Sequence, residues 1–166
     1  MSGPEEPARG RLLVVTGAEA EARVALGTAL AARLGDAVLV DGAALERLVR
    51  VVPPQHWSGE PTTPQLSNRL LRWSAALAVV ETYQLEGHDT VLVEDAVGDR
   101  LEDLLTLIDP EPVHLVVIAD GLDRTTPRWG LWVTARGPVE ETAASVIDRL
   151  AEALLETADP QAQPDP

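Results

Sequence analysis

Residues 17–24 have the spacing of a phosphate-binding loop, and they directly follow an apolar run. An apolar strand, a glycine turn and a helix build the loop G-x-x-x-x-G-K-[ST], whose backbone N–H groups cradle phosphates. Gly17 keeps the first glycine of this pattern. The second glycine, the lysine and the hydroxyl residue are replaced, in that order, by Ala22, Arg23 and Val24. The sequence therefore predicts the frame of a phosphate loop without its usual chemistry.

Two carboxylates stand in this loop where an anion would have to lie. Glu19 and Glu21 would repel a phosphate and compete with it for the N–H groups at the start of the following helix. Arg23 would keep a positive charge, but its planar guanidinium differs in geometry from a lysine ammonium. We expect Arg23 either to contact a phosphate or to be a solvated or glutamate-paired residue of the first helical turn. The chain contains no lysine, so no other segment supplies one.

Further carboxylates stand where two apolar runs end. Asp41 follows the run 37–40, and Glu94 and Asp95 follow the run 90–93. In parallel sheets, ligands bind outside the carboxyl ends of the strands. Asp41 is also placed to cap a helix. Glu94 and Asp95 could share a proton, bind a metal or cap the next helix.

Apolar runs alternate with amphipathic segments along the chain. Strands are expected at 11–16, 37–40, 90–93, 113–119 and 130–134, and helices at 20–34, 43–51, 64–86, 99–108 and 138–157. Because each strand is apolar almost throughout, the pattern predicts a parallel sheet that helices cover on both faces. The expected fold class is α/β, a three-layer sandwich with a five-stranded, mostly parallel sheet.

A single domain is expected at 11–157. Residues 1–10 and 158–166 are rich in proline and polar residues, so we expect both segments to be disordered. The Pro-rich stretch 52–64 is the clearest internal loop. Its Trp57 is a candidate for lining a pocket or a partner surface.

The composition excludes several classes of function. The net charge of −14 disfavours a nucleic-acid partner, because that binding depends on Lys and Arg neutralising phosphates. Without cysteine, the chain has no disulfide and no thiolate zinc ligand. The histidines are far apart and show no ligand spacing, so no metal site is expected. The aromatic residues Trp129 and Trp132 are expected to pack in the core.

The sequence also lacks the signals of a membrane or secreted protein. No apolar run approaches the roughly 18 residues of a membrane helix. The start of the chain has neither the basic region nor the apolar stretch of a signal peptide. We therefore expect a cytoplasmic protein without a membrane partner.

Two stretches carry a resemblance to a known family. One runs from Leu-Leu-Arg at 70–72 through Glu-Thr-Tyr at 81–83 to the acidic pair at 94–95, and the other is Thr-Pro-Arg-Trp-Gly-Leu-Trp at 126–132, with Glu-Glu-Thr behind it. With the order of elements over about 11–155, they resemble the P-loop small-molecule kinases. The similar branches are the chloramphenicol-phosphotransferase-like and the gluconate- or shikimate-kinase-like enzymes. The resemblance implies a sheet of P-loop nucleoside triphosphate hydrolase type.

The resemblance also implies roles for particular residues. The first loop binds ATP in the family, which makes Gly17, Ala22, Arg23 and Val24 the cofactor-binding positions. Asp41 corresponds to the acidic residue that can orient or deprotonate the acceptor hydroxyl. The family's substrate or metal side corresponds to the pair Glu94 and Asp95. Between Asp120 and Pro127, only six residues stand where family members place a lid of several turns.

Two hypotheses follow from these departures. The first is a pseudoenzyme, a degenerate kinase-like protein that serves as a binding or protein-interaction module, with a protein partner or a second copy of the chain. It would use no cofactor. The alternative is a divergent ATP-dependent phosphotransferase acting on a small hydroxylated molecule. It would need ATP and Mg²⁺, with Arg23 on the phosphate and Asp41 as the base.

Overall fold

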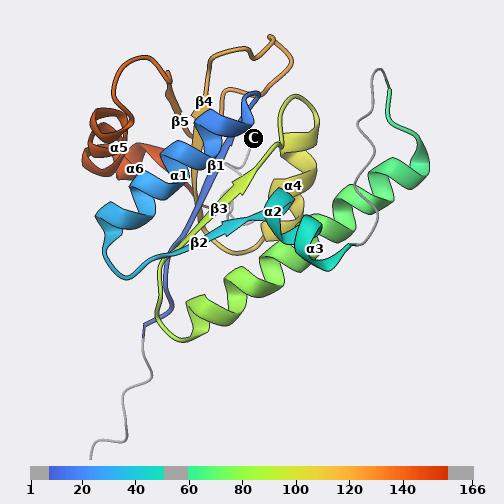
Figure 1. Cartoon of the computed structure of the whole chain (residues 1–166), viewed down its shortest axis with the longest axis horizontal. Helices are drawn as coiled ribbons and strands as arrows, with labels where there is room; N and C mark the ends of the chain where they lie inside the picture. The colour runs from blue at the N-terminus through green and yellow to red at the C-terminus, as the bar shows by residue number, and fades with distance from the viewer. Residues whose placement is uncertain (1–7, 51–59, 157–166) are drawn as a thin grey trace, which may run out of the picture.

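A computed structural model of the chain describes residues 8–50 and 60–156. Its strands are β1 (Leu12–Gly17), β2 (Val38–Asp41), β3 (Thr90–Glu94), β4 (Val113–Ile118), β5 (Leu131–Val133) and β6 (Leu154–Leu155). Its helices are α1 (Ala20–Leu34), α2 (Gly42–Val49), α3 (Thr63–Leu85), α4 (Arg100–Ile108), α5 (Val139–Asp148) and α6 (Leu150–Ala153). Figure 1 shows the strands side by side between two groups of helices.

The five longer strands form a parallel sheet in the order β2-β3-β1-β4-β5. Successive side chains of a strand point to opposite faces, and β1 accordingly supplies both cores. Val14 packs with α3 and α4 on one face, around the buried Trp73. Leu13 and Val15 pack with α1 and α5 on the other face. The α/β sandwich with five parallel strands is thus confirmed (Figure 1).

The end of the domain differs from the single helix predicted at 138–157. Helix α5 ends at Asp148, and after the short α6 the chain turns into β6, which pairs antiparallel with the start of β4. Strand β5 pairs with β4 only from Val116 onward, so the first residues of β4 have an open edge on that side. His114 and Val113 pair there with β6. This long-range pairing overrides the helical pattern of the segment.

Helix α3 begins with strong local signals, and it carries Arg72, which lines the candidate site. The Thr62 side chain and Gln65 form a capping box, and a proline stands in the first turn. The chain leaves the helix at Gly87, whose φ of 88° few residues other than glycine adopt. The helix was predicted to begin only at residue 64, after a loop at 52–64. Trp57 and most of that loop lie outside the described residues.

Further expectations concern the ends of the chain, the tryptophans near β5 and membrane helices. Of the segments predicted to be disordered, residues 1–7 and 158–166 lie outside the described part of the chain. Gly10 exchanges two hydrogen bonds with Gln84, both of 2.9 Å. The expectation that Trp129 packs in the core is wrong, because it lies before β5 begins and is 41% exposed. Trp132 does pack against the core. No helix in the described part is long and apolar enough to cross a membrane.

Candidate functional site

The connection between β1 and α1 is short. Only Ala18 and Glu19 lie between the end of the strand and the first residue of the helix. Glu19 is the extended N-cap of α1, and no side chain caps the helix. The main-chain N–H of Arg23 already donates an α-helical hydrogen bond of 3.1 Å to the carbonyl of Glu19. The residues at the second-glycine, lysine and hydroxyl positions are therefore part of the regular helix.

The Arg23 side chain turns back onto this connection. Its guanidinium donates to the carbonyl oxygens of Gly17 and Ala18, at 2.6 and 2.8 Å. The residue is only 8% exposed, and its Nε has no hydrogen-bond partner. The expectation of a solvated or glutamate-paired Arg23 is thus wrong. The turn presents two carbonyl oxygens inward, and the guanidinium supplies the donors that they need.

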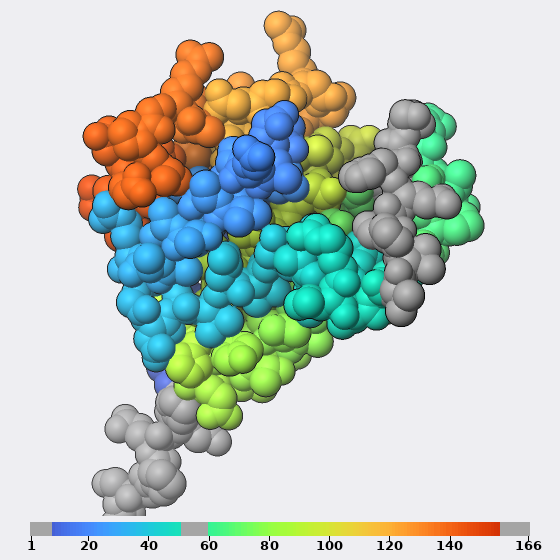
Figure 2. Space-filling model, in the orientation of Figure 1, coloured from blue at the N-terminus to red at the C-terminus, as the bar shows by residue number. Residues whose placement is uncertain are grey.

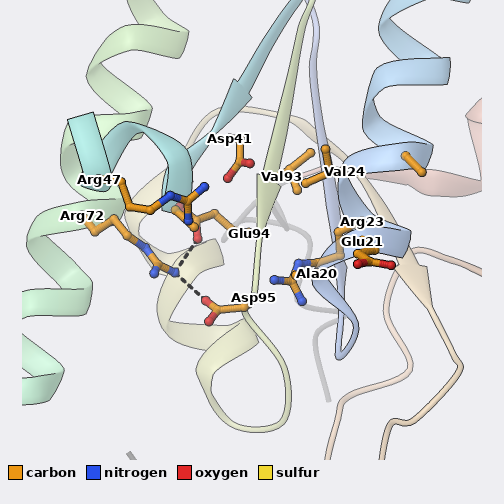
Figure 3. Close-up of a pocket in the computed structure, with 12 residues that line it drawn as sticks. Ala20, Glu21, Arg23, Val24, Asp41, Arg47, Arg72, Val93, Glu94 and Asp95 are labelled. Carbon is orange, nitrogen blue, oxygen red and sulfur yellow. Dashed lines mark hydrogen bonds and ion pairs between the residues drawn. The ribbon is translucent and has the colours of Figure 1, made fainter. Parts of the chain in front are cut away.

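A cavity of about 500 Å³ opens beside this turn, at the carboxyl ends of β2 and β3. Its lining comes from α1, α2, α3 and the strand ends: Ala20, Glu21, Arg23, Val24, Ala25, Asp41, Ala43, Arg47, Arg72, Val93, Glu94 and Asp95 (Figure 3). In the space-filling view, α1 (blue) and α2 (cyan) lie on the same face of the molecule (Figure 2). The edge predicted from the strand ends therefore carries a cavity large enough for a small molecule.

The cavity brings together most of the residues predicted from the sequence. Asp41, Arg23, Val24 and the acidic pair at the end of β3, Glu94 and Asp95, all line it (Figure 3). Gly17 does not line it; it is the last residue of β1 and pairs with Ile118 in the sheet. Ala22 lines a separate cavity of about 110 Å³ between α1 and the β5–α5 connection.

Glu94 is the most perturbed acid of the site. Its side chain is 1% exposed, and its Oε2 accepts a 2.6 Å hydrogen bond from Arg72. Gly42 leaves room for this carboxyl group, because a Cβ at that position would collide with Oε1. Burial raises the pKa of Glu94 to about 7, against the opposing effect of Arg72. Asp95 adds a like charge that raises it further.

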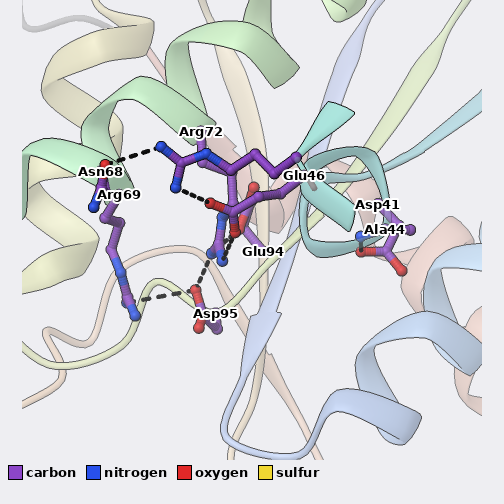
Figure 4. Close-up of polar contacts among 9 residues, drawn as sticks. Asp41, Ala44, Glu46, Asn68, Arg69, Arg72, Glu94 and Asp95 are labelled. Atoms are coloured by element: carbon purple, nitrogen blue, oxygen red, sulfur yellow. Dashed lines mark hydrogen bonds and ion pairs between the residues drawn. The ribbon is translucent and has the colours of Figure 1, made fainter. Parts of the chain in front are cut away.

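Arg72, on α3, holds the acidic groups together (Figure 4). One of its terminal nitrogens donates to Glu94 at 2.6 Å and to Asp95 at 2.5 Å. The other lies 3.6 Å from a carboxylate oxygen of Glu46 on α2. Arg69, one turn earlier, forms an ion pair of 3.4 Å with Asp95. Burial works to raise the pKa of Asp95, but the two arginines outweigh it and hold that pKa below its usual value.

Asp41 has a structural role at the same edge. Its Oδ1 accepts a 3.0 Å hydrogen bond from the main-chain N–H of Ala44, so it caps α2 (Figure 4). Its side chain also lines the cavity. The capping interpretation is confirmed, and a role as a base stays a prediction.

Arg72 and Glu46 belong to the site although no sequence motif marks them. Both charged residues are largely buried on their helices, Arg72 with its side chain 10% exposed and Glu46 with its side chain 7% exposed. A charge in such a position needs a buried partner. The identity of that partner depends on how α2 and α3 pack against β3, which the sequence does not specify locally.

The connection between β4 and β5 matches the short spacing noted in the sequence. Residues 119–130 are all described, and they contain turns but no helix. Asp120 accepts a 2.7 Å hydrogen bond from the main-chain N–H of Ala135, which ties the start of this connection to the chain after β5. In the described part of the chain, no helical lid covers the cavity.

The chain has structural but no sequence relatives among the proteins compared. No protein-family model matches it, and no curated protein matches it. Among solved structures, the Mycobacterium tuberculosis APS kinase CysC in complex with AMPPNP and APS is 16% identical, with a TM-score of 0.65 over 87% of this chain and 99% of that one. A Sinorhizobium meliloti gluconokinase is 16% identical, with a TM-score of 0.53 over 87% and 93%.

A third similar structure is the tunicamycin resistance protein of Deinococcus radiodurans. It is 14% identical, with a TM-score of 0.54 over 90% of this chain and all of that one. At such low identity, the likeness is one of fold, and it covers nearly the whole length of each neighbour. The chain therefore has the fold of the P-loop small-molecule kinases.

Proposed function

We propose that this chain is a pseudoenzyme, a kinase-like protein that binds a small molecule or another protein and does not carry out ATP-dependent phosphotransfer. The observation that carries the proposal is the position of Arg23. Its guanidinium is buried against the β1–α1 turn and bound to the carbonyls of Gly17 and Ala18. A phosphate loop must present N–H groups around an open space, and here the arginine lies against the short turn.

The residue types support the same proposal. Val24 has no hydroxyl for Mg²⁺, the chain has no lysine, and Glu19 and Glu21 bring negative charge to the helix start. Phosphoryl transfer depends almost wholly on positioning and electrostatic stabilisation. Loss of a single preorganised donor typically costs about 3–4 kcal/mol of transition-state stabilisation. Several losses together would remove useful catalysis.

The retained cavity supports a binding role. It lies at the carboxyl edge of the sheet, where open α/β folds bind ligands. The APS kinase neighbour was solved with AMPPNP and APS, so this fold can hold small molecules. A protein partner or a second copy of the chain, and a cytoplasmic location, stay predictions from the sequence.

One observation favours the alternative, a divergent phosphotransferase. Arg23 and Asp41 line the same cavity, as a phosphate contact and a base would have to. Asp41 is engaged as the cap of α2 through Oδ1, and Arg23 has turned to the loop carbonyls. Both residues would have to leave these contacts or use their remaining atoms, so we prefer the pseudoenzyme.

Restoring the loop tests the proposal by gain of function. A variant with Ala22→Gly, Arg23→Lys and Val24→Thr, together with Glu19→Gln and Glu21→Gln, is expected to bind Mg²⁺·ATP saturably in a calorimetric titration. The unmodified chain is expected to give no binding heat, because it lacks these groups. A matched control carries only Glu19→Gln and Glu21→Gln and should also give none. Turnover of ATP by the unmodified chain, with any hydroxylated acceptor, would contradict the proposal.

A further inference from the structure

Helix α2 has little apolar surface to hold it on the domain. Two of its eight residues are buried, Gly42 and Glu46, and neither is apolar and large. Leu45 packs against the core but is only partly buried. The last two apolar residues of the helix, Leu48 and Val49, are 84% and 70% exposed. Because apolar burial is the dominant force that docks a helix, α2 can leave its place at a low cost.

The polar contacts of α2 with the rest of the domain are also weak. A carboxylate oxygen of Glu46 lies 3.6 Å from a terminal nitrogen of Arg72 on α3. Arg50, directly after α2, lies 3.4 Å from Glu46 and donates a 3.1 Å hydrogen bond to Asn68. Charge-assisted hydrogen bonds are usually about 2.7–2.9 Å long. Helix α2 is therefore the element beside the cavity that most easily moves.

The start of α2 lies directly against the carboxyl group of Glu94 (Figure 4). A Cβ on Gly42, the first residue of the helix, would collide with Oε1 of Glu94. The Glu94 side chain is 1% exposed, and Gly42 is one of the groups that cover it. Movement of α2 would thus let water reach this carboxyl group.

The docked position of α2 opposes the ionisation of Glu94. Burial raises the pKa of Glu94 to about 7, and Asp95 acts in the same direction, whereas Arg72 and the indole of Trp73 act to lower it. Arg72 is not free to neutralise Glu94 alone, because it also contacts Asp95 and Glu46. An ionised Glu94 would therefore be better solvated with α2 displaced.

Other charged groups near Glu94 come from each element around it. Arg69 on α3 pairs with Asp95, and Arg50 pairs with Glu46. The remaining charged residues of the cavity lining are Asp41 and Arg47 from the region of α2, and Glu21 and Arg23 from α1. Among the described residues, no three acidic or histidine side chains come together as metal ligands. Glu94 is thus a buried acid whose ionisation is balanced by the protein's own charges.

We propose that α2 is a proton-controlled wall of the cavity, docked while Glu94 is protonated and released when Glu94 ionises. Ionisation favours the released state because water then reaches the carboxylate. Release opens the cavity on one side, since α2 contributes Ala43 and Arg47 to its lining. The inference is independent of the proposed function, because α2 would move in this way whatever the cavity binds.

Hydrogen exchange of main-chain amides in the full chain, without any ligand, tests this inference. Protection factors at pH 6 and pH 8 are compared, which removes the effect of pH on the intrinsic exchange rate. With a pKa of about 7 in the docked state and 4.5 in the released state, the protection of α2 should fall about tenfold. Strand β1 should be more protected than α2 at both pH values, because its amides exchange only when the whole domain unfolds.

Three variants make the test specific. Glu94→Gln does not titrate, so α2 should be equally protected at pH 6 and pH 8. Glu140→Gln is the matched control, because it makes the same change of charge at an exposed position on α5, and it should keep the tenfold fall. Gly42→Ala pushes α2 off Glu94, so α2 should be poorly protected at both pH values while β1 stays protected.

Three results would overturn the inference. The first is a protection of α2 that does not change with pH in the original chain. The second is a protection of α2 equal to that of β1, because α2 would then open only with the whole domain. The third is a fall of the original size in Glu94→Gln. None of these results bears on ATP binding, which tests the proposed function separately.

Discussion

Arg72→Ala should lower the free energy of unfolding by about 3–5 kcal/mol at pH 8, the range for breaking a buried ion pair by removing one partner. Arg72 is the donor shared by Glu94, Asp95 and Glu46, and its side chain is only 10% exposed. Removing it leaves Glu94 and Glu46, each at most 7% exposed in the side chain, without the cation that both contact. Equilibrium unfolding in urea measures the change.

Two further variants show whether the loss comes from the buried charges around Arg72. Arg100→Ala breaks a partly exposed ion pair of 2.7 Å with Asp103 and should cost no more than about 1 kcal/mol. Adding Glu94→Gln to Arg72→Ala should recover part of the loss, because it removes the uncompensated buried charge. If Arg72→Ala costs no more than Arg100→Ala, the cluster around Arg72 does not stabilise the fold.

Glu94 should make the stability fall as the pH rises from about 5 to 8. The pKa of Glu94 is raised from 4.5 to about 7 in the folded chain. Between these values the folded state holds a proton that the unfolded state has released. The stabilisation is therefore complete below pH 4.5 and is lost as the pH rises through 7. The loss should reach at most about 3 kcal/mol, the free energy of a shift of this size.

Urea unfolding at pH 5.5, 6.5, 7.5 and 8.5 tests this pH dependence. Glu94→Gln should flatten the curve over this range, because the amide does not titrate. Arg72→Ala should be least harmful at the acidic end, where Glu94 is protonated. Arg72 on α3 and Asp95 directly after β3 act on Glu94, and Glu46 on α2 shares Arg72 with it. Equal slopes in the original chain and in Glu94→Gln would show that another group titrates.

The parallel strands and most helices could be predicted because each depends on the residue pattern of its own segment. Apolar runs and helical periodicity placed the five parallel strands and most helices within a few residues. The strand at Leu154–Leu155 could not be found in this way. It exists because the start of β4, about 40 residues earlier, has an open edge that attracts an extended segment.

Some residues of the candidate site could also be predicted from the sequence, and others could not. Asp41, Glu94 and Asp95 were predicted from their place at strand ends, which a parallel sheet brings to one edge. Arg72 was missed because it reaches Glu94 across 22 residues of sequence, through the packing of α3 on β3. The inward turn of Arg23 was also missed, because it depends on where the carbonyls of Gly17 and Ala18 point.

Calorimetric titration of the unmodified chain with ATP and Mg²⁺ tests the central claim most directly, with thermal melts at millimolar nucleotide alongside. A ligand at 100 times its dissociation constant stabilises a fold by about 2.7 kcal/mol, which a melt would register. The pseudoenzyme proposal predicts no saturable heat and no shift of the melting temperature. Saturable heat with a raised melting temperature would contradict it and would favour the divergent phosphotransferase.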